Sequence, residues 1–266
     1  MRKIKKLIRN VKIFYQHKDR IKDIQNEIKE ELGSIHFQFA SFGGADINYY
    51  VLRNNKKFGM LRLAIANKVD KENIAIIRLN KQKRLNKEYQ AYSLGSKHSL
   101  TPAVLYYTTD ALVCEYLEGE RVFDILQKDK SKVWDILISS IKIYHNLHKL
   151  GITHLDATLK NFIWIEGQMK VIDFEYYAAD NFTIEEQKAY DYVRIIEHTL
   201  RAIPMKYQND YQKCIEVLDE VVPEEVKSVN FVQVAQWLKN IENYPIYPML
   251  KKRIFKQLEF NTLGKK

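Results

Sequence analysis

Short apolar runs rich in aromatic and β-branched residues, separated by polar connections, fill the first half of the chain after residue 34. The segments 35–42, 47–53 and 58–65 have this character, which is typical of β-strands. A helical stretch over 80–96 follows, and two more strand-like runs lie at 103–108 and 111–117. The pattern predicts a five-stranded antiparallel sheet accompanied by one helix.

Helical spacing dominates elsewhere. In residues 3–15 apolar residues recur at helical spacing while most lysines fall on another face, which predicts a basic amphipathic helix. Such a helix can lie on anionic lipid, or pack on the protein with its basic side in water. Ser131 is expected to cap a helix that ends near Gly151. Thr183 and Glu186 form an S/T-x-x-E capping box for a helix running to about 202.

These elements predict an α+β protein with a β-rich N-terminal lobe and a mostly helical C-terminal lobe. We expect a helical segment at 1–34, a nucleotide-binding lobe at 35–117 and a helical lobe at 118–266. The cysteines, Cys114 and Cys214, have no zinc-site spacing. No apolar run reaches the length needed to span a bilayer, and the basic start lacks the apolar core of a signal peptide. We therefore expect a cytoplasmic protein.

Positive charge gathers at the two ends of the chain. Residues 1–30 carry ten Lys or Arg against four Asp or Glu, and residues 251–266 carry six against one. Because the net charge of the whole chain is +10, the stretch between is close to neutral. The distribution indicates either solvated ends or peripheral contact with an anionic partner, such as the inner face of a membrane. No nucleic-acid-binding motif accompanies it, so no nucleic-acid partner is expected.

Candidate chemistry concentrates in residues 151–178, GITHLDATLKNFIWIEGQMKVIDFEYYA. Two short strand-like runs, FIWI and KVIDF, flank a turn, and polar residues lie at their ends. His154, Asp156 and Asn161 form H-x-D-x-x-x-x-N, and Asp173 follows twelve residues later in D-F-E. One carboxylate can face a substrate hydroxyl, while the amide and the second carboxylate can converge on Mg²⁺, which prefers oxygen ligands. The pattern indicates phosphoryl transfer.

These motifs resemble the protein-kinase-like superfamily, in its aminoglycoside phosphotransferase, choline kinase and lipopolysaccharide kinase branch. HLDATLKN resembles the catalytic loop, VIDFEYY the metal-binding segment and FGGADINYYVL the phosphate loop. KEYQAYSLGSKHSLTPAVLYYTTDALVCEYLEGE resembles the helix with its acidic residue, two strands and the hinge. The similarity covers roughly residues 35–200, with the parts in the same order, and implies a bilobal protein-kinase-like fold that uses ATP and Mg²⁺.

In the catalytic region the resemblance implies that Asp156 is the base that orients and deprotonates the acceptor hydroxyl. His154 braces the loop, and Asn161 and Asp173 hold Mg²⁺. Lys160 either contacts the transferring phosphate or faces solvent. We expect a structural role for Asp191, which follows the metal segment and could pair with the catalytic-loop backbone.

For the nucleotide, the resemblance implies that Gly43 and Gly44 let the backbone approach the phosphates, although the loop has fewer glycines than G-x-G-x-x-G. Arg62 stands where protein kinases have a lysine, and Glu88 where its acidic partner is expected, so we predict an ion pair between them. The adenine is expected to meet backbone groups of three consecutive residues: Glu115, Tyr116 and Leu117.

Three hypotheses remain open for the function, and two of them differ in the acceptor. The basic ends favour a sugar hydroxyl of a cell-envelope glycan or glycolipid, as in lipopolysaccharide kinases. The D-F-E segment favours a soluble small molecule such as choline, ethanolamine, an amino sugar or an aminoglycoside, with a pocket of acids including Glu175, Asp180, Glu185 and Glu186 near two tyrosines. The third is a catalytically silent pseudokinase or binding module, although Asp156, Asn161 and Asp173 are all present.

Overall fold

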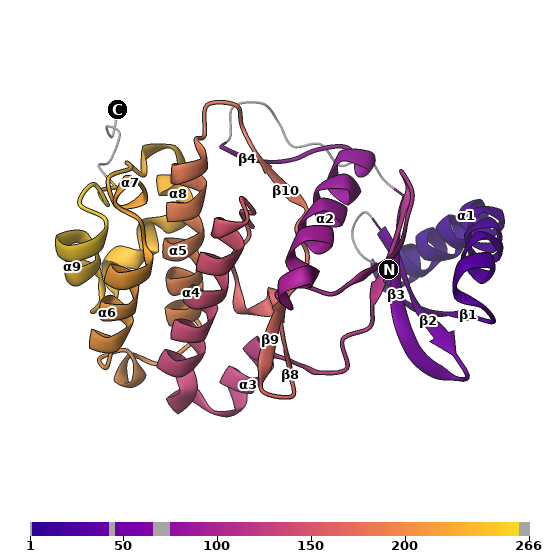
Figure 1. The fold of residues 1–266 in the computed structure, drawn as a ribbon, viewed down its shortest axis with the longest axis horizontal. Coiled ribbons are helices and arrows are strands. Elements are labelled where there is room, and N and C mark those ends of the chain that lie inside the picture. The colour runs from indigo at the N-terminus through magenta and orange to yellow at the C-terminus, as the bar shows by residue number, and fades with distance from the viewer. Residues whose placement is uncertain (1, 43–45, 66–74, 261–266) are drawn as a thin grey trace.

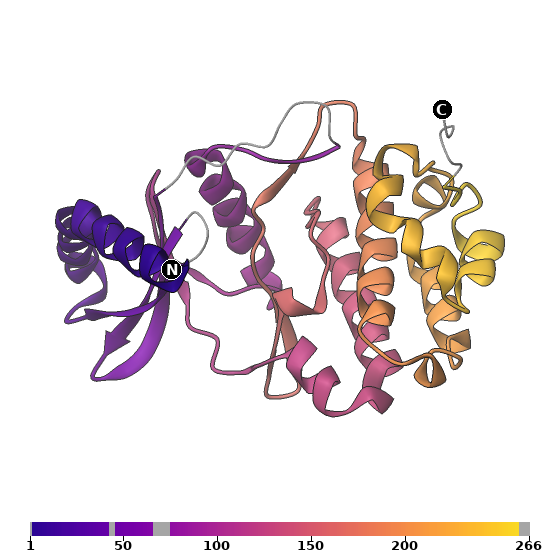
Figure 2. The ribbon, with the colours of Figure 1, turned by 180° about the vertical axis from the view of Figure 1, so that it is seen from behind.

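A computed structural model describes residues 2–42, 46–65 and 75–260, with side chains of the first helix described from Tyr15 onward. It has an α+β architecture (Figures 1 and 2): a long helix and an antiparallel sheet occupy one end, and a group of helices occupies the other. Helix α2 and a small hairpin lie between these parts. The expected α+β class and five-stranded antiparallel sheet are confirmed.

The sheet consists of β1 (His36–Phe42), β2 (Asp46–Arg53), β3 (Lys56–Ala64), β5 (Val104–Tyr107) and β6 (Ala111–Glu115). Its spatial order is β1-β2-β3-β6-β5, with every neighbouring pair antiparallel. Successive side chains point to opposite faces of a strand. Leu61 and Val113 therefore join the core on one face, whereas Arg62 and Leu112, which pair in register, face a pocket on the other.

Helix α1 (Arg2–Leu32) covers the first of these faces (Figure 1). Ile21, Ile24 and Ile28 recur at helical spacing and are buried against the sheet. Arg20 fixes the helix further, because its guanidinium donates two hydrogen bonds of 2.9 Å to Asp110 at the turn before β6. The predicted N-terminal helix is confirmed, and its second half packs on the sheet.

Helix α2 (Lys81–Gly95) lies against the other face, close to β3, β5 and β6 (Figure 1). Asn80 caps it by accepting a hydrogen bond of 3.0 Å from the Lys83 N–H. The described helix is thus the one expected over 80–96. It carries Glu88 toward β3, where that residue meets Arg62.

The helical part is built around α4 (Val133–Lys149) and α5 (Ile184–Arg201), which pack on each other in a large core. The Thr183–Glu186 capping box is confirmed. The expected cap at Ser131 is wrong: the carboxylate of Asp129 accepts from Ser131 and caps a short 3₁₀ turn, and α4 begins only at Val133. The remaining helices are α3 (Val122–Lys128), α6 (Gln212–Val221), α7 (Glu224–Lys227), α8 (Ala235–Leu238) and α9 (Tyr247–Met249).

Strands β8 (Phe162–Ile165) and β9 (Gln168–Val171) form the predicted hairpin. Glu166 and Gly167 both have positive φ, as a tight two-residue turn requires. The two-residue strand β7 (Glu120–Arg121) adds to its edge. A pairing that the sequence did not predict joins β4 (Ile76–Arg78) to β10 (Tyr176–Ala178), two segments far apart in the chain. None of the described helices is long and apolar enough to cross a membrane.

Candidate active site

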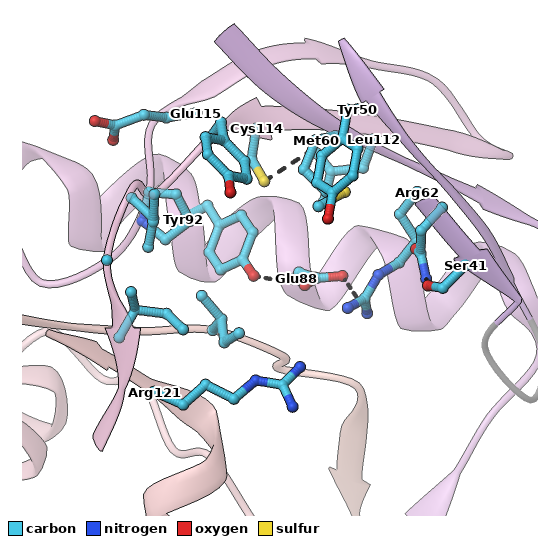
Figure 3. A pocket seen from close by; sticks show the side chains of 17 residues that line it. Ser41, Tyr50, Met60, Arg62, Glu88, Tyr92, Leu112, Cys114, Glu115 and Arg121 are labelled. Carbon is cyan, nitrogen blue, oxygen red and sulfur yellow. Dashed lines mark hydrogen bonds and ion pairs between the residues drawn. The ribbon is translucent and has the colours of Figure 1, made fainter. Parts of the chain in front are cut away.

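A pocket of about 340 Å³ lies between the sheet, helix α2 and the segment that follows β6 (Figure 3). This volume is within the range of small-ligand sites. The structure brings five of the predicted nucleotide-binding residues into its wall: Arg62, Glu88, Glu115, Tyr116 and Leu117. The other two, Gly43 and Gly44, lie outside the described residues.

The predicted ion pair between Arg62 and Glu88 is confirmed, with 2.8 Å between Nη1 and Oε2. The same Nη1 lies 3.0 Å from Oδ1 of Asp173. The Tyr92 hydroxyl donates to Glu88 at 2.6 Å and accepts from the backbone N–H of Asp173 at 3.1 Å. These four residues form a closed circuit, here called the ionic ring, which ties β3 and α2 to the D-F-E segment.

The two acids of the ionic ring differ in their protonation. Burial raises the pKa of Glu88 to about 7, although the charge of Arg62 opposes the shift. Burial would also raise the pKa of Asp173, but Arg62, with His154 and Arg78, outweighs it and holds that pKa below its ordinary value. Near neutral pH the arginine therefore faces an ionised Asp173 and a Glu88 that is close to its titration point.

The segment 115–117, which is expected to meet the adenine, lines the pocket. The Glu115 carboxylate points away to Lys170, whose ammonium lies 2.8 Å from it. The Tyr116 N–H is already bonded to the Phe58 carbonyl at 3.1 Å. The Leu117 N–H has no hydrogen-bond partner among the described residues, so it is an unpaired backbone donor in a segment that lines the pocket.

The segment also passes very close to the hairpin at Gly119. A Cβ atom built at this glycine would lie 2.2 Å from the carbonyl oxygen of Trp164. Only glycine allows the two backbones to approach in this way. Together with the β7–β8 pairing, this contact fixes the far edge of the pocket.

The residues that are expected to form a catalytic loop make a second, adjoining network. The Asn161 amide donates to the Asp156 carbonyl at 2.9 Å and to its carboxylate at 3.3 Å. His154 accepts from the Asp156 N–H at 3.2 Å through Nδ1, so the ring hydrogen is assigned to Nε2, which bonds the Ile172 carbonyl at 3.0 Å. His154 thus links the loop to the D-F-E segment, in agreement with its predicted bracing position.

Asp191 holds the backbone of residues 154 and 155 in place, which agrees with its expected structural role. Its side chain is fully buried in α5 and accepts from the backbone N–H groups of His154 at 2.7 Å and Leu155 at 2.8 Å. His148 Nε2 lies 3.1 Å from the same carboxylate. Leu155 has φ +66°, a conformation that a non-glycine residue adopts only when its surroundings compensate. The Asp191 hydrogen bonds supply that compensation.

Asp156, Asn161 and Asp173 lie at one end of the β8–β9 hairpin. The Ile172 N–H donates to the Asn161 carbonyl at 2.9 Å, which places Asn161 opposite the residue before Asp173. Asp173 is itself in a left-handed conformation, with φ +72°, and its side chain is 34% exposed. An amide oxygen and a partly exposed carboxylate fit Mg²⁺, which takes one or two protein oxygens and fills its remaining positions with water and phosphate.

No cluster of three His, Cys, Asp or Glu side chains suited to a metal occurs in the described part of the chain. A cation bound here would therefore need further oxygen ligands besides these side chains. Phosphate oxygens of a ligand are of the required kind.

A buried charge network includes Glu175, the last residue of the D-F-E segment. Arg84, 3% exposed, binds Glu175 at 3.0 Å and Asp46 at 3.2 Å. Arg78 also pairs with Glu175 and donates to the Tyr176 hydroxyl at 2.7 Å. The carboxylate of Glu175 is thus occupied by two guanidinium groups that join α2 and β4 to this segment.

Two further side chains, the predicted site residue Lys160 and the pocket residue Cys114, lie apart from these networks. The side chain of Lys160 is exposed, and its ammonium lies 5.2 Å from the centre of the Phe123 ring at the start of α3. Cys114 lines the pocket, but burial raises the pKa of its thiol to about 12, so it is a packing residue and not a nucleophile.

The structure adds residues that the sequence motifs did not select. Tyr92 follows Glu88 by one helical turn, a spacing that could have revealed it. Arg121 lines the pocket from β7, and no motif signals it. In comparisons with known proteins, no family model matches the chain and no curated protein matches its sequence.

Proposed function

We propose that this chain is an ATP- and Mg²⁺-dependent phosphotransferase with a bilobal protein-kinase-like fold, acting on a sugar hydroxyl of a cell-envelope glycan or glycolipid. The observation that carries the proposal is the ionic ring. It joins the pocket residues Arg62 and Glu88 to Asp173, next to the Asp156–Asn161 pair. A nucleotide pocket, an acid for the metal and an acid for the acceptor hydroxyl thus adjoin one another.

In this proposal the adenine lies against the 115–117 backbone and the phosphates extend toward Arg62. Asp156 orients the acceptor hydroxyl and takes its proton. The hydroxyl oxygen forms a bond to the γ-phosphorus while the bond from that phosphorus to the β–γ bridging oxygen breaks, and ADP leaves. Asn161 and Asp173 would hold Mg²⁺, which neutralises phosphate charge when bound. Asn161 also keeps Asp156 in place through its two hydrogen bonds.

The acceptor class is inferred from charge. The basic chain ends favour an anionic, membrane-surface substrate and a peripheral location at the inner face of the membrane. The alternative hypothesis, a kinase with a soluble cationic acceptor, depends on a pocket of acids that includes Glu175 and Glu186. Glu175 is occupied by Arg78 and Arg84, and Glu186 caps α5. These pairings weigh against choline, ethanolamine or an aminoglycoside as acceptor.

The test is phosphate transfer from γ-labelled ATP with Mg²⁺ to the membrane-glycolipid and soluble fractions of the cells that make the protein. We expect label in the glycolipid, and none with Asp156→Asn, which keeps the shape of the side chain but removes the base. Label among soluble metabolites alone would instead support the small-molecule kinase. Nucleotide binding without transfer to either fraction would support a catalytically silent protein.

A further inference from the structure

We propose that Arg121 binds the phosphate chain of the nucleotide, as a second cationic contact facing Arg62 across the pocket. This inference rests on the proposed function, because it assigns a ligand group to one wall of the same pocket. Arg121 lies outside all the motifs that select the other residues, and its position in the fold carries the argument.

Among the described residues that line the pocket, Arg121 is the cation that lacks a counter-charge. Within the described part of the chain, its exposed side chain makes no hydrogen bond or ion pair. The other charged groups of the pocket wall are compensated, since Arg62 pairs with Glu88 and Glu115 pairs with Lys170. A ligand that fills the pocket therefore meets one guanidinium that protein groups do not neutralise.

The backbone that carries Arg121 is held firmly. Strand β7 pairs with β8, and Arg121 lies opposite Ile163. Gly119, two residues before Arg121, packs closely against the Trp164 carbonyl. In Figure 3 Arg121 enters from the wall opposite β3, beneath Tyr92 and Glu88. Arg62 comes from the sheet and Arg121 from the hairpin side, so the ligand lies between cations carried by two different parts of the fold.

The chemistry of the guanidinium favours phosphate over the base. Arginine offers donors only, in a planar fork that matches two phosphate oxygens. Charge-assisted hydrogen bonds of this kind are about twice as strong as neutral ones. In the proposed function the base meets backbone groups at 115–117, and a neutral nucleoside has no charge with which to pair Arg121.

The experiment measures binding of adenosine, ADP and ATP to the full-length protein by isothermal titration calorimetry. We expect Arg121→Ala to weaken ADP and ATP about 10- to 100-fold, the usual range for losing hydrogen bonds to a charged group, and to leave adenosine unchanged. Arg121→Lys should recover part of the loss, because it keeps the charge but not the fork. Arg201→Ala, at an exposed arginine outside the pocket, is the matched control and should bind like the wild type.

Three outcomes would overturn the inference. If Arg121→Ala binds ADP as tightly as the wild type, the residue makes no phosphate contact and only this inference fails. If adenosine and ADP weaken equally, the residue serves the nucleoside or the shape of the pocket. If the wild type binds none of the three ligands, the proposed function fails as well. Thermal unfolding should be the same for Arg121→Ala and wild type, because the side chain is exposed and makes no hydrogen bond or ion pair with the described residues.

Discussion

Replacing Glu88 with glutamine tests the ionic ring directly. The Glu88 side chain is 3% exposed, pairs with Arg62 at 2.8 Å and accepts from Tyr92 at 2.6 Å. Burial raises its pKa from 4.5 to about 7. Glutamine has nearly the same shape and does not titrate, and its single carbonyl oxygen can accept from either Tyr92 or Arg62. The substitution therefore removes a proton-binding site with little change in packing.

The sign of the pH effect follows from proton binding. Between pH 4.5 and 7 the folded protein keeps a proton on Glu88 that the unfolded chain has released. The free energy of unfolding must then fall as pH rises through this window. One pKa unit corresponds to about 1.4 kcal/mol, so the shift is worth roughly 3 kcal/mol, fully present below pH 4.5 and lost once the pH exceeds 7.

The assay is urea unfolding of wild type and Glu88→Gln at pH 5 and pH 8, without nucleotide or divalent cation. We expect the stability of the variant, relative to wild type, to rise by roughly 2–3 kcal/mol between these pH values. Taking the difference between the two proteins cancels the titrating groups that do not interact with Glu88. Glu118→Gln, at an exposed site in the connection after β6, should follow the wild type. Parallel curves for Glu88→Gln and wild type would refute the reasoning.

Three further substitutions probe other parts of the site. Asp191→Ala leaves two buried backbone N–H groups unpaired and should lower the free energy of unfolding by about 3 kcal/mol, measured by urea unfolding; wild-type stability would contradict the anchoring role. Glu175→Gln takes a counter-charge from buried Arg84 and should cost about 3–5 kcal/mol by the same measure, and a neutral result would mean that the arginine finds water instead. Gly119→Ala places a Cβ 2.2 Å from the Trp164 carbonyl and should cost about 1–3 kcal/mol while weakening ADP binding; unchanged ADP affinity would show that the pocket edge tolerates the shift.

Much of the local structure followed from sequence because it depends on neighbouring residues. The five sheet strands, the helix that carries Glu88 and the capping box at Thr183 are all set by short-range pattern. The pairing of Arg62 with Glu88 and the anchoring role of Asp191 were predicted because the order of motifs placed these segments together.

The remaining features depend on contacts that no local pattern encodes. Strands β4 and β10 have three residues each and lie about a hundred residues apart, so neither stands out as a strand alone. Arg84 is buried only because Asp46 and Glu175 neutralise it, whereas an arginine on a helix is ordinarily expected at the surface. The contact between Arg62 and Asp173 was missed because the D-F-E carboxylate was assigned to metal alone.

If the proposed function holds, the contact between Arg62 and Asp173 should make the binding of metal and of nucleotide depend on each other. In the described structure the two groups neutralise each other at 3.0 Å. If Asp173 turned to a cation alone, Arg62 would keep only Glu88, whose pKa of about 7 leaves it partly protonated near neutral pH. If Arg62 turned to a phosphate alone, Asp173 would lose its nearest positive charge. When both ligands bind, the metal supplies a cation for Asp173 and the nucleotide supplies an anion for Arg62. The metal should therefore bind more tightly when the nucleotide is present, and the nucleotide more tightly when the metal is present.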